Sequence, residues 1–187
     1  MKMPDREIKP GYHPPFPHIR LNEKFHLREQ AISDTESFLA YYNDPKVYEH
    51  ILAEIPKTPQ QAKDEIIYCR NLFYQQTGIY WAIAESENNT MIGAIGFYER
   101  DNNQLELCYD LHKNYWSKGI THLAIQKVLD YAREKMQRNQ FFALTTKSNF
   151  ASISVLKKNN FIFDKTLVKT RYFQGQLHDV ERFILNY

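Results

Sequence analysis

The chain has 187 residues, of which 43% are hydrophobic and 25% are charged, as expected for one soluble globular domain with a sizeable core. The net charge of +2 is too small to indicate a nucleic-acid-binding protein. No apolar run approaches the roughly 18 residues that span a bilayer. The two cysteines exclude a disulfide framework, and the N-terminus lacks the apolar stretch of a signal peptide. We therefore expect a cytoplasmic protein without membrane or direct nucleic-acid partners.

The first 22 residues are rich in proline, which lacks a backbone N–H and opposes both helices and strand ladders. We therefore divide the chain into a proline-rich N-terminal arm, residues 1–22, and a single domain, residues 23–187. His13 and His18 lie in the arm without other His or Cys residues at metal-ligand spacing. The sequence holds neither an HExxH motif nor paired CxxC motifs, so we expect no metal site.

The first half of the domain mixes strand and helix patterns. Ser33 and Asp34 are good residues to begin a helix, and Thr58-Pro59 supplies a cap and a first helical residue for a second one. Asn88-Asn89 predicts a hairpin turn, because Asn tolerates positive φ. The expected elements are a strand, a helix, a short helix, a long helix and two hairpin strands: residues 24–30, 34–44, 47–52, 60–76, 79–84 and 90–98.

The stretch 104–137 changes its periodicity half-way. Its first part alternates, with Leu105, Leu107, Tyr109 and Leu111 on one face and Glu106, Cys108, Asp110 and His112 on the other, which predicts a half-buried strand. Its last part repeats apolar residues every three and four positions from Ile120, which predicts a helix lying against a sheet.

A short loop containing Gly119 joins this strand to this helix. The first turn of a helix has unpaired N–H groups and partial positive charge, which together suit a phosphate. Gly119 allows the backbone close to such a ligand, and Lys118 adds a mobile positive charge. On this stretch alone, an ordinary strand-to-helix connection explains the glycine equally well.

The second half continues with a strand at 141–146 and a helix capped by Ser148 or Asn149. Asn159-Asn160 is expected to end this helix, with one of the two in the left-handed conformation that Gly usually adopts. Strand patterns follow at 161–168, 171–173 and 180–185. Antiparallel hairpins that lead into a strand–loop–helix–strand unit predict a mixed sheet, parallel only near the central helix.

Two segments resemble the GCN5-related N-acetyltransferases (GNATs). The loop Trp116–Thr121 is similar to the motif in which Arg or Gln, two residues, Gly, one residue, then Gly or Ala wrap the pyrophosphate of acetyl-CoA; only Gly119 matches strictly. Tyr115-Trp116 followed by Lys-Gly-Ile resembles the RimJ/RimL branch, the ribosomal-protein N-terminal acetyltransferase type. Residues 149–161 resemble the Asn-x-x-Ser…Val-Leu-x-Lys-x-Gly-Phe segment of the same enzymes, with Asn160 in place of Gly.

The resemblance implies an α+β fold with a single GNAT-like domain. Its central mixed, mostly antiparallel, twisted sheet has about seven strands, splayed between the fourth and fifth, and is flanked by helices. Acetyl-CoA, as co-substrate, lies in the opening, with its pantetheine on the backbone near Asp110 and Leu111 and on the Asn149 side chain. Its pyrophosphate meets Trp116, Ser117, Lys118, Gly119, Ile120 and Thr121. Lys157 and Lys158 either approach the distal phosphates or form a solvated helix face.

The reaction implied is direct attack of an amine on the thioester. Glu106 is the candidate general base, with Asp110 and His112 as alternatives on the same face. Leu156 stands where many GNATs carry a tyrosine that acts as the general acid. The resemblance to the RimJ/RimL branch makes Ser152 the candidate general acid, although packing at the helix start explains this serine as well. Tyr172 is a second candidate. Cys108 is read as a small apolar residue rather than a nucleophile.

These features predict an acetyl-CoA-dependent N-acetyltransferase, an acyltransferase that acts on a primary amine. The acceptor is a protein N-terminal α-amine, such as that of a ribosomal protein, or a small amine. The alternative is a non-catalytic acyl-CoA-binding or sensing module on the same fold, motivated by Ser117, Thr121 and the absent tyrosine. Both a monomer and a homodimer are compatible with the sequence.

Overall fold

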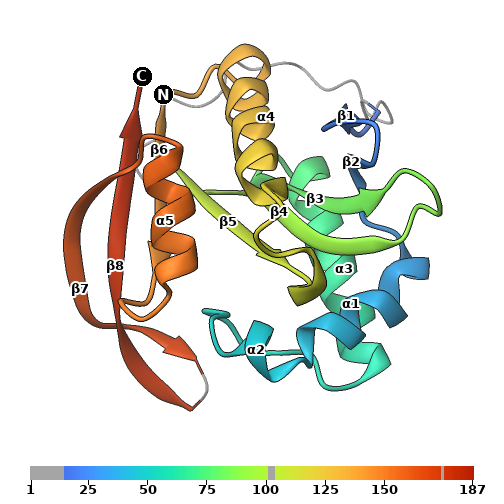
Figure 1. Ribbon diagram of the computed structural model, residues 1–187, viewed down its shortest axis with the longest axis horizontal. Coiled ribbons are helices and arrows are strands. Elements are labelled where there is room, and N and C mark those ends of the chain that lie inside the picture. Colours follow the sequence, from blue (N-terminus) through green and yellow to red (C-terminus); the bar gives the residue numbers. More distant parts are fainter. Residues whose placement is uncertain (1–14, 101–103, 174) are drawn as a thin grey trace.

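One mixed sheet organises the part of the chain that the computed structural model describes, residues 15–100, 104–173 and 175–187 (Figure 1). Its eight strands lie in the order β1-β2-β3-β4-β5-β6-β8-β7. The strands are β1 (Ile19–Arg20), β2 (Phe25–Glu29), β3 (Gly78–Glu85), β4 (Met91–Glu99), β5 (Leu105–Leu111), β6 (Gln140–Thr145), β7 (Ile162–Phe173) and β8 (Gln176–Asn186). The α-helices are α1 (Thr35–Tyr42), α2 (Pro45–Tyr48), α3 (Pro59–Tyr74), α4 (Ile120–Lys135) and α5 (Phe150–Lys158).

The predicted fold class is confirmed. Every neighbouring pair of strands is antiparallel except β5 and β6, which are parallel. These two strands pair only at Leu105↔Phe141 and Glu106↔Phe142. Beyond Glu106 the two strands separate, so the sheet opens between β5 and β6. These are the fourth and fifth of the seven strands that the sequence predicts.

Strand β1 was not predicted. It lies within the proline-rich arm, where no strand pairing was expected. Ile19 pairs with Leu27 and Arg20 with His26. The expectation fails here because neither β1 residue is a proline, so both keep the N–H that a ladder needs. Upstream, the backbone oxygen of Pro17 accepts a 2.8 Å hydrogen bond from the indole of Trp81, which fastens this end of the described chain to β3.

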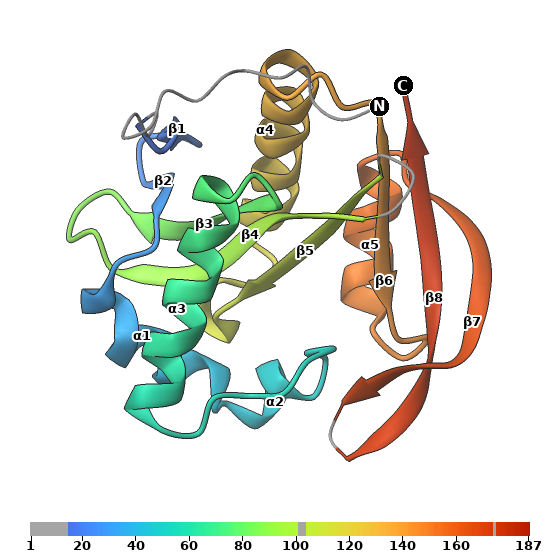
Figure 2. The same ribbon diagram turned by 180° about the vertical axis from the view of Figure 1, so that it is seen from behind.

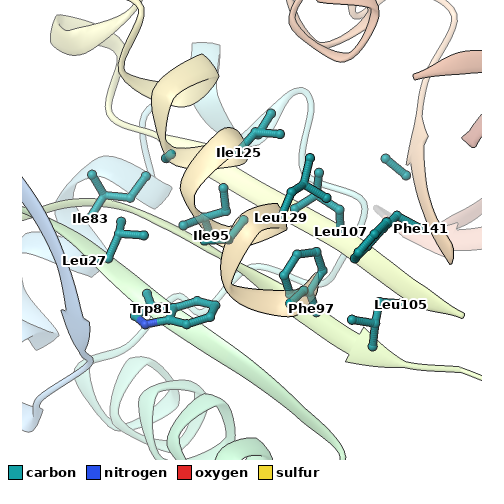
Figure 3. Packing of buried hydrophobic residues seen from close by; sticks show 14 of the residues in the cluster. Leu27, Trp81, Ile83, Ile95, Phe97, Leu105, Leu107, Ile125, Leu129 and Phe141 are labelled. Carbon is teal, nitrogen blue, oxygen red and sulfur yellow. The ribbon is translucent and has the colours of Figure 1, made fainter. Parts of the chain in front are cut away.

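Helices cover both faces of the sheet (Figures 1 and 2). Helices α4 and α5 lie on one face, where Leu105, Leu107 and Phe141 pack with Ile125 and Leu129 of α4 in the larger core cluster (Figure 3). Helices α1 and α3 lie on the other face and form a second cluster with β3 and β4. Because side chains alternate along a strand, the even-numbered residues of β5 face the α1 and α3 side.

Two caps chosen from the sequence are present. The Thr58 hydroxyl accepts a hydrogen bond from the Gln61 N–H at 3.2 Å at the start of α3. The Asn149 side chain accepts one from the Ser152 N–H at 3.0 Å at the start of α5. Asn160 has a φ of 65°, as expected for a left-handed residue after a helix. Among the residues described, no helix is long and apolar enough to cross a membrane.

Candidate functional site

The opening between β5 and β6 exposes one backbone edge of β5. The His112 N–H donates to the Ile92 oxygen of β4 at 2.8 Å. Since backbone groups alternate sides along an antiparallel strand, those of Asp110 also turn toward β4. The backbone groups of Leu107, Tyr109 and Leu111 turn toward the opening. This edge is suited to hold an extended ligand chain by backbone hydrogen bonds.

Asp110 presents its carboxylate to the α1 side of the sheet. It accepts hydrogen bonds from the Tyr41 hydroxyl at 2.7 Å and the Tyr42 hydroxyl at 3.0 Å, and one from the Ala94 N–H at 3.1 Å. Burial raises the pKa of Asp110 to about 6, although the three hydrogen bonds oppose this shift. Of the two residues predicted to line the pantetheine, Leu111 turns its backbone N–H toward the opening, whereas the Asp110 carboxylate is occupied by Tyr41, Tyr42 and Ala94.

The loop from Trp116 to the start of α4 lies at the open end of β5. The indole N–H of Trp116 donates to the Leu111 oxygen at 2.7 Å, which ties the loop to the strand. Gly119 is the N-cap of α4 with a φ of 77°, a conformation that other residues adopt at a cost. A Cβ added at Gly119 would meet no atom within 4 Å.

The remaining loop residues fit an anionic ligand at this helix start. Ile120 is buried and anchors the first turn of α4, and Thr121 is half-buried. Ser117 is exposed with a φ of 59°, and the ammonium group of Lys118 lies 5.1 Å from the ring centre of Tyr115. The first-turn N–H groups, the open space at Gly119 and a nearby cation together make residues 116–121 a loop suited to an anion.

A pair of hydroxyls spans the opening on the α4 and α5 side. Tyr109 of β5 and Ser152 of α5 lie 2.8 Å apart, oxygen to oxygen. Burial raises the pKa of Tyr109, so its hydroxyl keeps its proton. The sequence reasoning placed Tyr109 among the apolar residues of its strand and missed it as a site residue; its polar tip on an apolar face was the available signal.

Glu106 lies on the opposite face, at the last pair of β5 with β6. Only 2% of its side chain is exposed. One carboxylate oxygen accepts from Arg100 at 2.7 Å and the other from Arg171 at 2.9 Å. The sequence reasoning missed both arginines. Arg171 is 65 residues away along the chain, and no local pattern marks so distant an ion pair. Arg100 is only six residues away, so its closeness along the chain was the available signal.

The other sequence candidates lie in different surroundings. His112 caps a 3-10 turn, where its Nδ1 accepts from the Asn114 N–H at 3.0 Å. Tyr172 is 61% exposed on β7, and Leu156 is fully buried. Burial raises the pKa of the Cys108 thiol, which keeps it protonated and unreactive.

Two further observations concern the surroundings of the site. Lys157 and Lys158 are exposed near the end of α5. Across the described residues, no three His, Cys, Asp or Glu side chains lie close enough together to hold a metal ion.

Comparison with known proteins relates this arrangement to an enzyme family. Residues 24–162 match the acetyltransferase (GNAT) domain family. The uncharacterized N-acetyltransferase p20 of Bacillus licheniformis is 28% identical over 165 residues, which cover 87% of this chain and 93% of that protein.

Two solved structures share the fold. The RimL ribosomal L7/L12 alpha-N-protein acetyltransferase superposes with a TM-score of 0.81 at 17% identity, covering 92% of this chain and 95% of its own. The microcin C7 self-immunity acetyltransferase MccE, solved with acetyl-CoA and AMP, has a TM-score of 0.78 at 16% identity, covering 89% and 94%. By its family match, the chain belongs to the GNAT acetyltransferases and uses acetyl-CoA as the acetyl donor.

Proposed function

We propose that this protein transfers the acetyl group of acetyl-CoA to the α-amine of a protein N-terminus in a ternary complex. The observation that carries the proposal is the opening between β5 and β6. This opening has the loop 116–121 on the face of the sheet that α4 covers, and Glu106 on the opposite face. A donor that enters along one face and an acceptor that enters along the other would meet within it.

In this proposal the pyrophosphate lies on the backbone of residues 116–121, and the pantetheine follows the exposed edge of β5 at Leu111. Asp110 supports that edge from behind by fixing Ala94 of β4. The amide nitrogen of Asn149 is available to the pantetheine, because the cap of α5 uses its oxygen. These contacts position the donor; acetyl-CoA itself supplies an activated acyl group.

The acceptor nitrogen forms a bond to the acetyl carbon as the carbon–sulfur bond breaks. An α-amine, with a pKa of about 7.7–8.0 against about 10.4 for lysine, is substantially neutral at physiological pH and needs little help from a base. Glu106 takes the proton that the amine gives up, directly or through water. Ser152, with its partner Tyr109, delivers a proton to the departing sulfur.

Two features favour the alternative, a module that binds acyl-CoA without turnover. Leu156 occupies the position of the tyrosine that is usual in the family, and the Tyr109–Ser152 bond crosses the opening. Binding without acetylation of any peptide or small amine would establish this alternative. Acetylation of a small amine in preference to peptides would instead keep the enzyme and change its acceptor.

The division of the chain into residues 1–22 and 23–187 is also a proposal. Phe16 and Ile19 pack against the larger core cluster, so the described end of the arm belongs physically to the domain. The predictions for residues 1–14, which include His13, lie outside the described residues. We propose a cytoplasmic setting, in which the free thiols of Cys69 and Cys108 remain reduced.

The first test is calorimetric titration of acetyl-CoA into the wild type and Gly119→Trp. An indole at Gly119 would occupy the space next to the first turn of α4, so binding should weaken at least tenfold. Gly175→Trp is the matched control, because Gly175 has a φ of 78° and also has no atom within 4 Å of an added Cβ. Equal weakening in both variants, or none in Gly119→Trp, would move the donor site away from this loop.

A further inference from the structure

An open pocket of about 820 Å³ lies on the sheet face that carries Glu106. Phe142 and Leu144 of β6 form part of its lining, and their neighbours Phe141 and Ala143 point into the core on the α4 side. In Figure 2, α3 lies in front of β3 and β4, whereas β6 and β8 lie to the right of this helix. Because Glu106 belongs to the lining and ends the pairing with β6, the pocket reaches the start of the opening.

The lining of this pocket carries excess positive charge. Its cationic side chains are Arg100, Lys165, Arg171 and Arg182, and its carboxylates are Glu99 and Glu106. Both carboxylates are already engaged, Glu106 by two of these arginines and Glu99 by Arg138 from outside the lining. Arg182 is paired with Asp164. Lys165 is exposed, and in the described part of the chain its ammonium group makes no ion pair or hydrogen bond.

We infer that the acceptor is a protein N-terminus with acidic side chains directly after its first residue. This inference rests on the proposed function. With the α-amine at Glu106, the second and third residues of an extended peptide reach about 3.5 and 7 Å farther, toward the cations of β7. A guanidinium has five N–H donors, so Arg100 and Arg171 keep donors for an incoming carboxylate beyond those given to Glu106.

The size and composition of the pocket favour a peptide over a small amine. A volume of about 820 Å³ is near the upper end of ordinary ligand pockets, more than a single amino acid fills. Phe142, Leu144 and Leu167 add apolar surface between the charged groups. Such a mixture suits the alternating side chains of an extended peptide.

The test uses two heptapeptides with the same N-terminal alanine. One has aspartate and glutamate at positions two and three, and the other has asparagine and glutamine. With the full-length wild type, kcat/KM should favour the acidic peptide about tenfold, which corresponds to about 1.4 kcal/mol. Lys165→Glu should reduce this ratio at least threefold. Lys24→Glu, the same charge change on an exposed residue beside β2 at the other end of the sheet, should leave it unchanged.

A binding measurement separates a failure of the proposed function from a failure of the acidic-acceptor inference. It follows the two peptides by fluorescence anisotropy as they bind the protein in the presence of CoA. If neither peptide is acetylated although acetyl-CoA binds, the proposed function fails, and the binding ratio still decides the inference. Equal affinity for the two peptides, or a ratio that Lys165→Glu leaves unchanged, overturns the inference. So does free glutamate that competes as strongly as the acidic peptide, because the pocket would then be a small-molecule site.

Discussion

Two carboxylates on the same face of β5 lie in opposite electrostatic surroundings. Glu106 is held between the guanidinium groups of Arg100 and Arg171, at the last residue pair of β5 with β6. Asp110, four residues farther, is surrounded by tyrosine hydroxyls and apolar side chains, and burial opposes its charge. In the proposed function, Glu106 meets the acceptor amine, whereas Asp110 supports the strand through its hydrogen bonds.

Asp110 should make stability depend on pH. Its folded pKa of about 6 exceeds the ordinary value of 3.8, so the folded state binds the proton more tightly than the unfolded state. The contribution is therefore fully present below pH 3.8 and is lost as the pH rises to about 6, by about 3 kcal/mol at most. Asp110→Asn lacks this dependence. The free energy of unfolding from urea denaturation, taken as wild type minus Asp110→Asn, should therefore be larger at pH 4.5 than at pH 7.5. An unchanged difference would contradict the buried, proton-binding carboxyl.

Replacing Glu106 by Gln should reduce kcat by about 10²-fold if this group takes the proton of the acceptor amine. Asp34→Asn is the matched control, because Asp34 is also buried and paired with an arginine, Arg28, at 2.7 Å. Both variants should lose stability, since each leaves a buried or half-buried guanidinium without its anion. Steady-state kinetics should show the kcat loss only for Glu106→Gln; an equal loss in both would assign Glu106 a structural role.

At the scale of elements, the start of α5 combines a helix cap with a ligand contact. Asn149→Ala removes the cap and should cost about 1 kcal/mol, and it should also weaken acetyl-CoA binding severalfold. Thr58→Ala removes a cap of the same geometry from α3, with a similar loss of stability and unchanged acetyl-CoA affinity. Thermal unfolding and calorimetry on the two variants compare these effects, and equal affinities would remove Asn149 from the donor site.

Elements that depend on local rules were predictable from the sequence. Thr58 and Asn149 cap helices, and Asn160 ends one, because each uses only its neighbours in the chain. The strand-to-helix change around Gly119 followed from periodicity. The contacts of Glu106 and Tyr109 were not predictable in this way, because their partners Arg171 and Ser152 come from the other side of the sheet opening. The two-residue alternation of a strand predicts which face of the sheet a side chain is on, but it does not predict which residues contact that side chain.

At the scale of the whole molecule, the sheet consists of two parts that are joined by two residue pairs between β5 and β6. Strands β1 to β5 form one part and β6 to β8 the other. Within the described residues, the strand pairing between them is limited to Leu105 with Phe141 and Glu106 with Phe142. Helix α4 links the parts along the chain between β5 and β6. A donor that lies along the opening would contact both parts at once.

Acetyl-CoA should therefore protect backbone amides on both sides of the opening. Hydrogen exchange should slow in 107–111 on β5 and at the start of α5, beyond the protection of the loop before α4. At a ligand concentration of 100 times Kd, the stability gain should be about 2.7 kcal/mol. Protection confined to residues 116–121 would contradict a donor threaded between the strands.

The pocket beside Glu106 draws three of its four cations from the hairpin of β7 and β8, whereas the anion-suited loop lies between β5 and α4. The stretch that matches the family ends at residue 162, where β7 begins. The cationic lining therefore lies mainly in the last quarter of the sequence, after the stretch that matches the family. If the acceptor lies in this pocket as proposed, substitutions at Lys165 or Arg182 would change which partner is recognised without touching the loop before α4. Acceptor choice and acetyl-CoA use could then evolve separately.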